Sequence, residues 1–505
     1  MGVVGAVMGR MLQARARQAK GGARRRWARG ASLAALALML AGCSTILGAT
    51  KFDNPPGVAE PVSRADAFAL PSSVDDPEHA RILAAYGGIY DDPGAARAVA
   101  RAVGRVVAAS DDPSQTYRIT ILNTPVINAF ALPNGNLYVS RGLLALANDS
   151  SELAAVIAHE MAHVTARHAA ARARRNEAAQ TVGRVVANVV SDPDQQKMTL
   201  ASTQVSLARF SQVQELEADA IGVRTLSRAG YDPYASARFL TSMQRFSEFR
   251  AARAGKPDFL SSHPTTPERI TFAVRAAREI GAPGIGDQDR EAYIARLEGM
   301  TYGDDPSEGF VRGRSYVHRQ LGIALSVPAG WSLENSPKAV LGSDAEGSAF
   351  RFDSVNVPEG TDLGAYLGSG WLNGLDPASV RTTTVNAWPA ATGTASADGW
   401  NFRIGLVRVG KTTYRFFFAT QSPASALEKV FDETIASFRT ITAEEGQRLR
   451  PLRLGIHRVK AGETIETIAA RMAVGDRKSE LFQVLNGLEA GAELSVGQAV
   501  KLVVE

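Results

Sequence analysis

Apolar residues between positions 151 and 164 recur at the spacing of one face of an α-helix. Four residues make up this face: Leu153, Val156, Ile157 and Val164. Asp149 precedes the run, and Glu152 is three residues after Asp149. This spacing predicts an N-cap at Asp149 with a capping box. The pattern therefore predicts a helix that presents an apolar face to a core.

The same spacing rules predict further elements around this helix. Helices are expected at 77–85, at 93–109, at 205–228 with Gly230 as its end, and from 267 onward. Strands are expected at 116–122, 126–131 and 136–140, with a turn at Pro133-Asn134-Gly135. Residues 177–208 are either a lid or, the interpretation we favour slightly, two packed helices joined by a turn. Residues 73–302 are thus expected to form one mainly helical domain with a small sheet.

The pattern changes to period-two alternation in the middle of the chain. The alternating runs lie at 321–327, 349–352, 400–406 and 413–418. Helices near 361–369 and 424–437 are expected to cover one face of the resulting antiparallel sheet. Residues 308–447 carry no recognisable catalytic constellation, so they are interpreted by elimination as an accessory α+β domain.

The first 42 residues have the composition of a targeting segment. They contain eight Lys or Arg and no acidic residue, and the apolar run 31–41 suits a signal sequence but is too short to span a bilayer. The run ends in Leu40-Ala41-Gly42-Cys43, which resembles a bacterial lipoprotein box. That resemblance implies cleavage before Cys43 and its acylation; the alternative is an ordinary signal peptide with an incidental cysteine. Ser44 then implies sorting to the outer membrane, and 43–72, rich in Pro and Gly, is expected to be a tether.

Removal of residues 1–42 also removes the basic character of the chain. The formal net charge is +5 overall, and the eight positive charges of the leader leave −3 from Cys43 onward. The pI of about 9.3 is therefore no sign of nucleic-acid binding. A hydrophobic content of 45% is sufficient for globular cores, and the single cysteine excludes an intrachain disulfide.

Candidate catalytic and metal-binding residues lie on the helix predicted at 151–164. His159 and His163 are four residues apart, so both imidazoles point to the same side of the helix and can hold one Zn²⁺. Glu160 lies beside them and can take a proton from water on the metal and return it to a leaving amine. The His-Glu-x-x-His spacing is typical of zinc peptidases.

A catalytic zinc usually has three protein ligands, so a third ligand is required. Glu215 and Asp219 lie one turn apart on the predicted helix 205–228. Glu215 is the candidate third ligand, and Asp219 is suited to hold the second ring nitrogen of a ligand histidine. An acidic helix face alone is more often simply solvated, but its place after the histidine pair favours the metal site.

Residues from about 75 to 280 resemble the CAAX prenyl protease/HtpX/BepA family of zinc metallopeptidases. The resemblance rests on these segments: Asn128 to Gly135, Gly142-Leu143-Leu144, the zinc motif extended to Arg167-His168, Glu215 to Asp219, and Ser262-His263-Pro264. It implies His159, His163 and Glu215 as zinc ligands and Glu160 as the catalytic base. The family commonly has Arg at the position of Gln212, which leaves open what that Arg would orient.

Three further features are candidates for roles in the site. His168 is nine residues after His159 and is expected to support the site or the fold rather than to bind metal. His263 is expected on a loop near the cleft, where it either takes the fourth zinc position or stabilises the oxyanion, unless it is an ordinary loop histidine. The strand 128–132 is expected either to pair with substrate backbone or to be a plain internal strand.

Residues 455–505 resemble a LysM domain, with a strand, two helices and a strand in about fifty residues. The resemblance rests on 457–469, 485–488 and 494–502, with Glu463 and Ile465 as mild departures. LysM domains bind glycans that contain N-acetylglucosamine, such as peptidoglycan. Gly462, Glu463, Thr464 and the segment around Asn486 would form the groove, although such a fold can also serve only for packing.

Together these patterns predict a multidomain α+β protein that is a lipid-anchored periplasmic zinc endopeptidase. Its expected substrates are misfolded or misassembled envelope proteins, and its expected contacts are the membrane through Cys43 and peptidoglycan through residues 455–505. Two rival functions stay open. The first is a peptidoglycan amidase, and the second is a non-enzymatic assembly factor or chaperone with a structural zinc.

Overall fold

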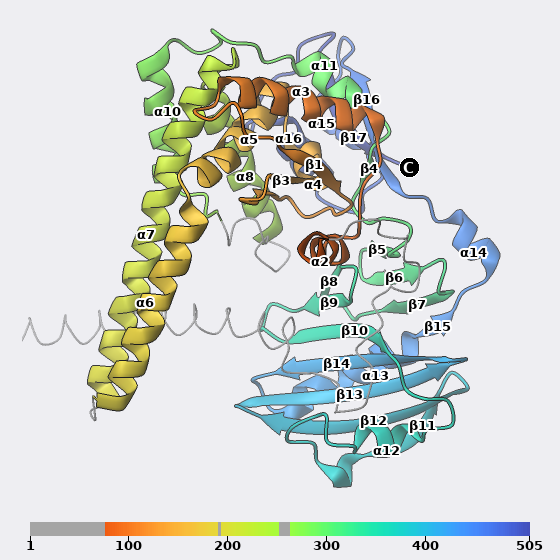
Figure 1. The fold of residues 1–505 in the computed structure, drawn as a ribbon. Helices are drawn as coiled ribbons and strands as arrows, with labels where there is room; N and C mark the ends of the chain where they lie inside the picture. The colour runs from red at the N-terminus through yellow and green to blue at the C-terminus, as the bar shows by residue number, and fades with distance from the viewer. Residues whose placement is uncertain (1–75, 190–192, 252–262) are drawn as a thin grey trace, which may run out of the picture. The chain divides into compact units, whose positions relative to one another are not determined.

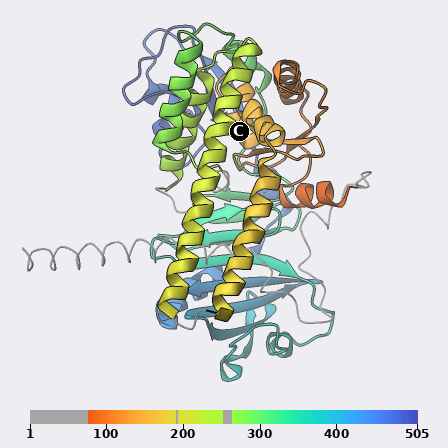
Figure 2. The same ribbon diagram turned by 60° about the vertical axis from the view of Figure 1, so that its left-hand side comes forward.

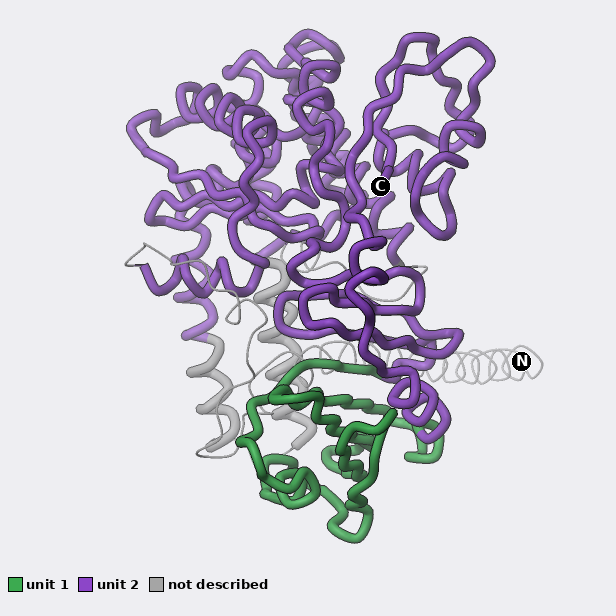
Figure 3. Tube along the Cα trace, turned by 90° about the vertical axis from the view of Figure 1, so that its right-hand side faces the viewer, with its two compact units in different colours: residues 1–61, 349–427 green, residues 62–348, 428–505 purple. Residues whose placement is uncertain are grey.

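The computed structural model describes residues 76–189, 193–251 and 263–505, with the side chains of 179–210 left out (Figure 1). The predicted leader, Cys43 and the tether lie outside the described residues. The described chain divides into two compact units, coloured in Figure 3: residues 349–427 and the remainder. All the residues singled out for chemistry around the histidine pair belong to the second unit.

The small sheet predicted for the first half of the chain has three strands in the order β1-β3-β2. Strands β1 (Arg118–Leu122) and β3 (Asn136–Ser140) pair in parallel, and β2 (Ala129–Ala131) pairs antiparallel with β3. The predicted turn closes with Gly135 N donating to Leu132 O at 3.0 Å, and Gly135 has a positive φ of 86°. Strand β2 is therefore an edge strand of this sheet.

Five helices of this region begin at a side chain that accepts backbone N–H groups. The capped helices are α2 (Pro77–Ala85), α3 (Pro93–Ala109), α4 (Arg141–Leu146), α5 (Ser150–Thr165) and α10 (Pro267–Ile280), with caps Asp76, Asp92, Ser140, Asp149 and Thr266. Three of them start with Pro, which needs no partner for an N–H in the first turn. The bounds of α2 and α3 and the start of α10 agree with the sequence pattern.

Helix α5 is capped as predicted at one of the two contacts of a capping box. Asp149 Oδ1 accepts from the Glu152 N–H at 2.7 Å. Glu152 Oε2, however, accepts from the N–H of Asn148 at 2.9 Å, one residue earlier than a capping box requires. The N-cap prediction is confirmed and the capping box is wrong, because the chain enters the helix with Asn148 turned toward the carboxylate.

Helix α5 is enclosed rather than amphipathic. Every residue from Ser150 to His163 is buried, so the predicted apolar face is only part of its packed surface. Small residues on the other faces, such as Ala154 and Ala158, allow neighbouring helices to approach closely. The elements that pack on it include α3, β2, α7 (Pro193–Arg228) and α8 (Ala235–Ala251).

Helices α6 (His168–Val189) and α7 form a long antiparallel pair that Figure 2 shows side by side. Helix α7 contains the predicted helix 205–228 and starts earlier than the pattern indicated. Its end near Gly230 is as predicted, and Gly230 has a positive φ of 79°. Residues 177–208 are thus mostly helical, which agrees with the packed-helix alternative for this segment.

The second unit also contains shorter elements, all but the first of which follow α10 in the chain. They are α4 (Arg141–Leu146), α11 (Arg290–Arg296), β4 (Thr301–Tyr302), β5 (Phe310–Arg312), β6 (Ser315–His318), β7 (Ile323–Ser326), β8 (Ser332–Asn335), β9 (Val340–Ser343), α13 (Glu428–Ser437), β15 (Arg439–Thr440) and α14 (Ala443–Arg448). Strands β15, β7, β6 and β5 form an antiparallel sheet in that order, and β8 pairs with β9. Helix α13 packs on β7.

The first unit is an antiparallel sheet of long strands, and three of the four period-two runs, 349–352, 400–406 and 413–418, lie in it. The run 321–327 and the helix expected at 424–437 lie instead in β7 and α13 of the second unit, so residues 308–447 are not one domain as predicted. The strands of the first unit follow the order β11-β12-β13-β14-β10, with β10 (Ala349–Val355), β11 (Arg381–Val385), β12 (Trp388–Ala397), β13 (Trp400–Val409) and β14 (Thr412–Thr420). Helix α12 (Leu363–Leu367) packs on β12; two 3₁₀ turns, η2 (Pro377–Ser379) and η3 (Ala424–Leu427), complete the unit. Its core includes Leu367, Trp371, Ile404 and Phe417.

The last segment has the predicted order of strand, two helices and strand. Its elements are β16 (Leu452–Arg458), α15 (Ile465–Ala469), α16 (Lys478–Asn486) and β17 (Ala499–Val504). Strands β16 and β17 pair antiparallel, and β16 also pairs with β4. Their apolar side chains belong to the same core as those of α3 and α5.

A buried lysine fastens this last segment to the helix that precedes α5. Lys501 Nζ donates to the backbone oxygens of Ala145, Leu146 and Ala147 at 2.7, 3.2 and 2.8 Å. Lys501 itself is 0% exposed. The segment is therefore built into the unit that holds α5.

The described chain is a multidomain α+β structure, as predicted. Within the described ranges, no helix combines the length and the apolar character needed to cross a bilayer.

Candidate metal centre

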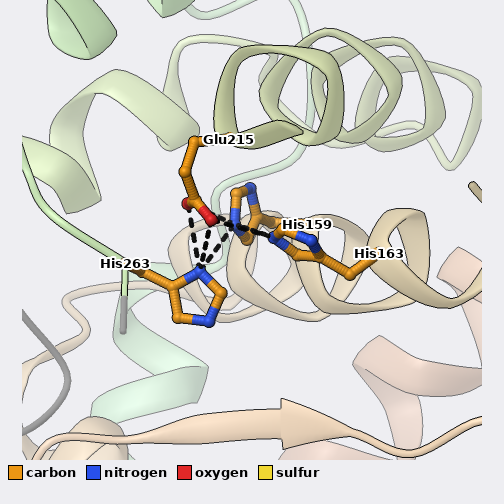
Figure 4. Close-up of side chains that lie close together, drawn as sticks. All are labelled: His159, His163, Glu215 and His263. Carbon is orange, nitrogen blue, oxygen red and sulfur yellow. Dashed lines mark hydrogen bonds and ion pairs between the residues drawn. The ribbon is translucent and has the colours of Figure 1, made fainter. Parts of the chain in front are cut away.

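Four side chains with metal-binding atoms converge beside α5 (Figure 4). His159 and His163 come from α5, Glu215 comes from α7, and His263 comes from the loop before α10. All four are buried, and one ligand atom of each lies within 4.8 Å of the others. The structure therefore brings together the three predicted ligands and also His263.

The distances between these atoms suit a shared metal ion. His159 Nε2 lies 3.0 Å from His163 Nε2 and 3.4 Å from Glu215 Oε2, and His163 Nε2 lies 3.5 Å from Glu215 Oε1. His263 Nδ1 lies 3.0 Å from Glu215 Oε2. Ligand atoms that share one Zn²⁺ tetrahedrally at 2.0–2.1 Å are roughly 3.3 Å apart. Nitrogen and oxygen lone pairs that face one another in this way fit Zn²⁺, the metal of this peptidase type.

Close packing of α7 on α5 sets these distances. Gly222 of α7 lies against the backbone of α5, where an added Cβ would be 3.3 Å from the N atom of His159 and 3.4 Å from its Cα. Ala218 on the same face is fully buried. Residues without bulk at this contact allow Glu215 and Asp219 to reach the histidines.

Asp219 lies beside His159, one of the two predicted ligand histidines, as the sequence led us to expect. Its Oδ1 is 2.9 Å from His159 Nδ1, so it can accept the proton on that nitrogen and leave Nε2 directed at the site. Burial alone would lower the pKa of His159, but its contacts with Asp219 and Glu215 raise it to about 9. The metal-free site therefore holds a proton on His159 at neutral pH.

Arg269 was not singled out from the sequence and takes part in the same cluster. Its Nε and Nη2 both lie 2.8 Å from the oxygens of Asp219, and its Nη1 lies 3.1 Å from Glu215 Oε2. The hydrogen bonds from Arg269 and the nearby His159 ring hold the pKa of Asp219 below its usual value despite burial. Gln212, where the family commonly has Arg, is exposed, so Arg269 is the cation that orients both carboxylates here.

One signal in the sequence pointed toward Arg269. It stands in the first turn of the helix that follows His263-Pro264, and a short link between a candidate ligand and a helix start places nearby residues at the site. The missing information was the packing of α10 on α7, which brings residues 50 positions apart into contact.

Glu160 is buried next to the four converging side chains. It is 3% exposed, and its Oε1 lies 3.8 Å from His263 Nε2. That oxygen has no hydrogen-bond partner among the residues the structure describes. Burial raises the pKa of Glu160. A buried carboxylate with an oxygen left for another partner suits a group that exchanges protons with a substrate or water.

The other predicted residues are placed as follows. His168 is buried behind His163, with its Nδ1 2.8 Å from His163 Nδ1. The strand predicted at 128–132 is the edge strand β2, which packs along α5.

In the last segment, Gly462 is exposed, whereas Asn486 is buried and its side chain is hydrogen-bonded to the backbone of Phe482 and Lys501. Asn486 is thus part of the core rather than of an open groove.

Part of this chain is similar in sequence to known proteins. Residues 93–277 match the model of peptidase family M48. The "Beta-barrel assembly-enhancing protease" of Yersinia pestis is 32% identical over 213 residues, which are 40% of this chain and 43% of that protein. The protein of the same name from Escherichia coli (strain K12) is 29% identical over 201 residues, 38% of this chain and 40% of that one.

A mitochondrial protein is also similar to part of this chain. "Mitochondrial metalloendopeptidase OMA1" of Schizosaccharomyces pombe is 31% identical over 172 residues, 34% of this chain and 50% of that protein. The chain thus spans half or less of the length of these relatives. The matched part contains the paired histidines of α5 and the acidic residues of α7. The similarity to peptidase family M48 therefore rests on residues 93–277.

Proposed function

We propose that this protein is a zinc-dependent endopeptidase that hydrolyses peptide bonds in unfolded or misassembled proteins of a bacterial envelope. One observation carries the proposal: four buried metal-binding side chains converge at ligand spacing directly beside buried Glu160. The family match of residues 93–277 supports the same reaction class.

In this proposal His159, His163 and Glu215 hold the metal. Bound Zn²⁺ would supply Lewis acidity to the scissile carbonyl and to water. Glu160 takes the proton of the attacking water and returns it to the leaving amine, and its burial keeps that proton inside the site. Asp219 holds His159 by its Nδ1, and Arg269 keeps Asp219 ionised and also pairs with Glu215.

His263 has two roles compatible with its place. Its Nδ1 lies 3.0 Å from Glu215 Oε2, which supports a fourth ligand that closes the resting site. Its Nε2 lies on the side of Glu160, which suits stabilisation of the oxyanion after the loop moves. The two roles predict opposite effects of His263→Ala: a closing ligand gives higher activity on removal, and an oxyanion donor gives lower activity.

Substrate is proposed to bind as an added strand. Strand β2 is an edge strand and packs along the helix that carries the histidines, which supports pairing of extended backbone beside the site. Unfolded proteins offer such backbone, whereas folded proteins do not. The substrate class is supported further by the name of the bacterial relatives, beta-barrel assembly-enhancing protease.

The location of the protein is proposed from its sequence. The basic and apolar leader with Cys43 supports a lipid anchor in the periplasm, in the inner leaflet of the outer membrane. The LysM-like pattern of residues 455–505 supports contact with peptidoglycan through the exposed end around Gly462.

The test compares zinc content and casein proteolysis for the protein starting after Cys43 and for Glu160→Gln. We expect one zinc in both proteins and a loss of about 10²- to 10⁴-fold in activity in the variant, since a general base contributes that much. Glu279→Gln removes an exposed charge on α10 and is the matched control with unchanged activity. Equal activity in Glu160→Gln and wild type would refute the peptidase mechanism.

A second function is favoured by one specific feature, the presence of four donors rather than three. Four protein ligands are typical of structural zinc, so the same geometry suits an assembly factor without peptidase activity. Zinc in the wild type with no proteolysis, both before and after His263→Ala, would support this function instead.

A further inference from the structure

The second ring nitrogen of each ligand histidine meets a different kind of partner. His159 Nδ1 faces the carboxylate of Asp219, as described above. His163 Nδ1 faces another imidazole, that of His168, at 2.8 Å. Beyond it, His168 Nε2 lies 3.3 Å from Glu217 Oε2. The inference below concerns this second line of contacts and rests on the proposed metal site.

The protons along this line can be arranged in one way when His163 holds the metal. His163 Nε2 faces Glu215 and His159, so it supplies the lone pair and the ring carries its proton on Nδ1. That proton is donated to His168 Nδ1, which must then be unprotonated. The proton of the neutral His168 ring is therefore on Nε2, directed at the Glu217 carboxylate.

We propose that His168 and Glu217 are positioning residues that fix the tautomer and the ring orientation of His163 for metal binding. The contacts run from the Glu217 carboxylate through the His168 imidazole to the His163 imidazole. They take the place of the direct contact with a carboxylate, that of Asp219, which His159 makes. His168 carries most of the effect because it is 2% exposed, whereas the Glu217 side chain is 56% exposed and its charge is screened by water.

The backbone is shaped to hold His168 in this place. Helix α5 ends at Thr165, and Arg167 adopts a positive φ of 53°, which is unfavourable for a residue with a side chain. This single left-handed residue turns the chain so that α6 begins at His168. Gln214 of α7 donates its Nε2 hydrogen to His168 O at 3.3 Å and ties the start of α6 to the helix that carries Glu215. Unfavourable backbone geometry is retained where surrounding contacts require it.

A histidine that merely fills space would behave differently on substitution. Phenylalanine would replace such a residue with nearly the same volume and leave the metal site unchanged. Under the proposal, phenylalanine removes the acceptor of the His163 proton, so that ring loses its fixed tautomer. Asparagine keeps an acceptor close to the place of Nδ1 and loses only the link to Glu217.

The experiment measures Zn²⁺ affinity by chelator competition and the visible absorption of the Co²⁺-substituted protein. The variants are His168→Phe, His168→Asn and Glu217→Gln. Loss of a residue that supports a ligand typically weakens metal binding by about 10- to 100-fold, which is expected for His168→Phe. His168→Asn should recover most of this loss, and Glu217→Gln should weaken binding by about two- to fivefold. The Co²⁺ bands should shift in His168→Phe and return toward wild type in His168→Asn.

Two matched controls separate positioning from stability. His79→Phe removes another buried histidine of the same unit, whose Nδ1 is 2.7 Å from the Tyr138 hydroxyl. Glu279→Gln removes an exposed charge near the end of α10. Both should retain the affinity and the Co²⁺ spectrum of the wild type.

Three results would overturn the inference or its basis. If His168→Phe binds Zn²⁺ as tightly as His79→Phe with an unchanged Co²⁺ spectrum, His168 does not position His163. If His168→Phe fails to fold, equal affinities of His168→Asn, Glu217→Gln and wild type refute the proposal. A wild type that binds no Zn²⁺ refutes the metal site itself.

Discussion

Helix α5 carries a buried polar cluster at each end, and the two clusters are built differently. At its start, Asp149 caps the helix and lies 3.1 Å from Arg238, which also pairs with Asp232. Glu152 accepts from the N–H of Asn148. In the second half of the helix lie the paired histidines and Glu160.

The first cluster matches donors to acceptors. Carboxylates meet a guanidinium and backbone N–H groups, and nearby Lys501 meets three backbone oxygens. In the second cluster, ring nitrogens and carboxylate oxygens face one another, and Glu160 Oε1 has no hydrogen-bond partner among the described residues. The difference teaches that burial of charge does not by itself mark a functional site. A buried cluster with more hydrogen-bond acceptors than donors does mark such a site, because a cation or a proton must bind to balance the acceptors.

The largest effect should follow loss of the Arg269 guanidinium from the second cluster. Arg269→Met leaves two buried carboxylates without this shared partner, and we expect a loss of about 3–5 kcal/mol in the free energy of unfolding of the metal-free protein. Urea unfolding in the presence of EDTA measures it. The matched variant Arg238→Met in the first cluster should cost less, because that side chain is 34% exposed and water can replace it. Equal losses would remove the distinction between the clusters.

The next largest effect should be on metal affinity as pH changes. The raised pKa of His159, about 9, means that metal binding below this pH displaces a proton. Zn²⁺ affinity should therefore increase about tenfold per pH unit, roughly from pH 6 to 8, and level off above the pKa. Chelator competition at several pH values measures the slope. Asp219→Asn removes the contact that raises this pKa and should flatten the upper part of the curve; an unchanged curve would contradict the assignment.

A smaller effect should follow from breaking the first cluster. Asp149→Ala removes the N-cap of α5 and should lower the free energy of unfolding by about 1–2 kcal/mol. Zinc content and proteolysis per folded molecule should stay at wild-type values, because the cap lies at the opposite end of the helix from Glu160. Thermal unfolding and casein assays on the same sample test both parts. A large loss of activity in the folded variant would show that the two ends are coupled.

The smallest effect should come from the contact between α7 and α5. Gly222→Ala places a methyl group 3.3 Å from His159 N, so α7 must shift by a few tenths of an ångström. We expect Zn²⁺ affinity to fall by about tenfold, which corresponds to mild overpacking. Gly104→Ala in α3 is the matched control, because its added Cβ meets nothing within 4 Å. Its affinity should be unchanged, and an equal affinity in Gly222→Ala would mean that the helices adjust freely.

Local signals in the sequence were enough for much of this description. The cap at Asp149, the turn at Gly135 and the bounds of α2 and α3 depend on residues close together in the chain. The paired histidines of α5 are one helical turn apart, so they could be recognised from spacing alone.

Other parts depended on contacts that no local pattern records. Arg269 meets Asp219 only because α10 packs on α7. His168 contacts His163 closely because the backbone is left-handed at Arg167. An arginine in the sequence does not predict this conformation. The enclosure of α5 on every face likewise comes from its neighbours, since its own pattern indicated a single apolar side.

Lys501 has a consequence for the order in which this protein is made. The oxygens that it binds belong to residues up to 356 positions earlier in the chain. The ribosome must therefore synthesise residues 349–427 before Lys501 can donate its hydrogen bonds to the backbone that leads into α5. Contacts across so long a separation form late in folding. The backbone that leads into the histidine-bearing helix therefore gains these three hydrogen bonds only after nearly the whole chain has been made.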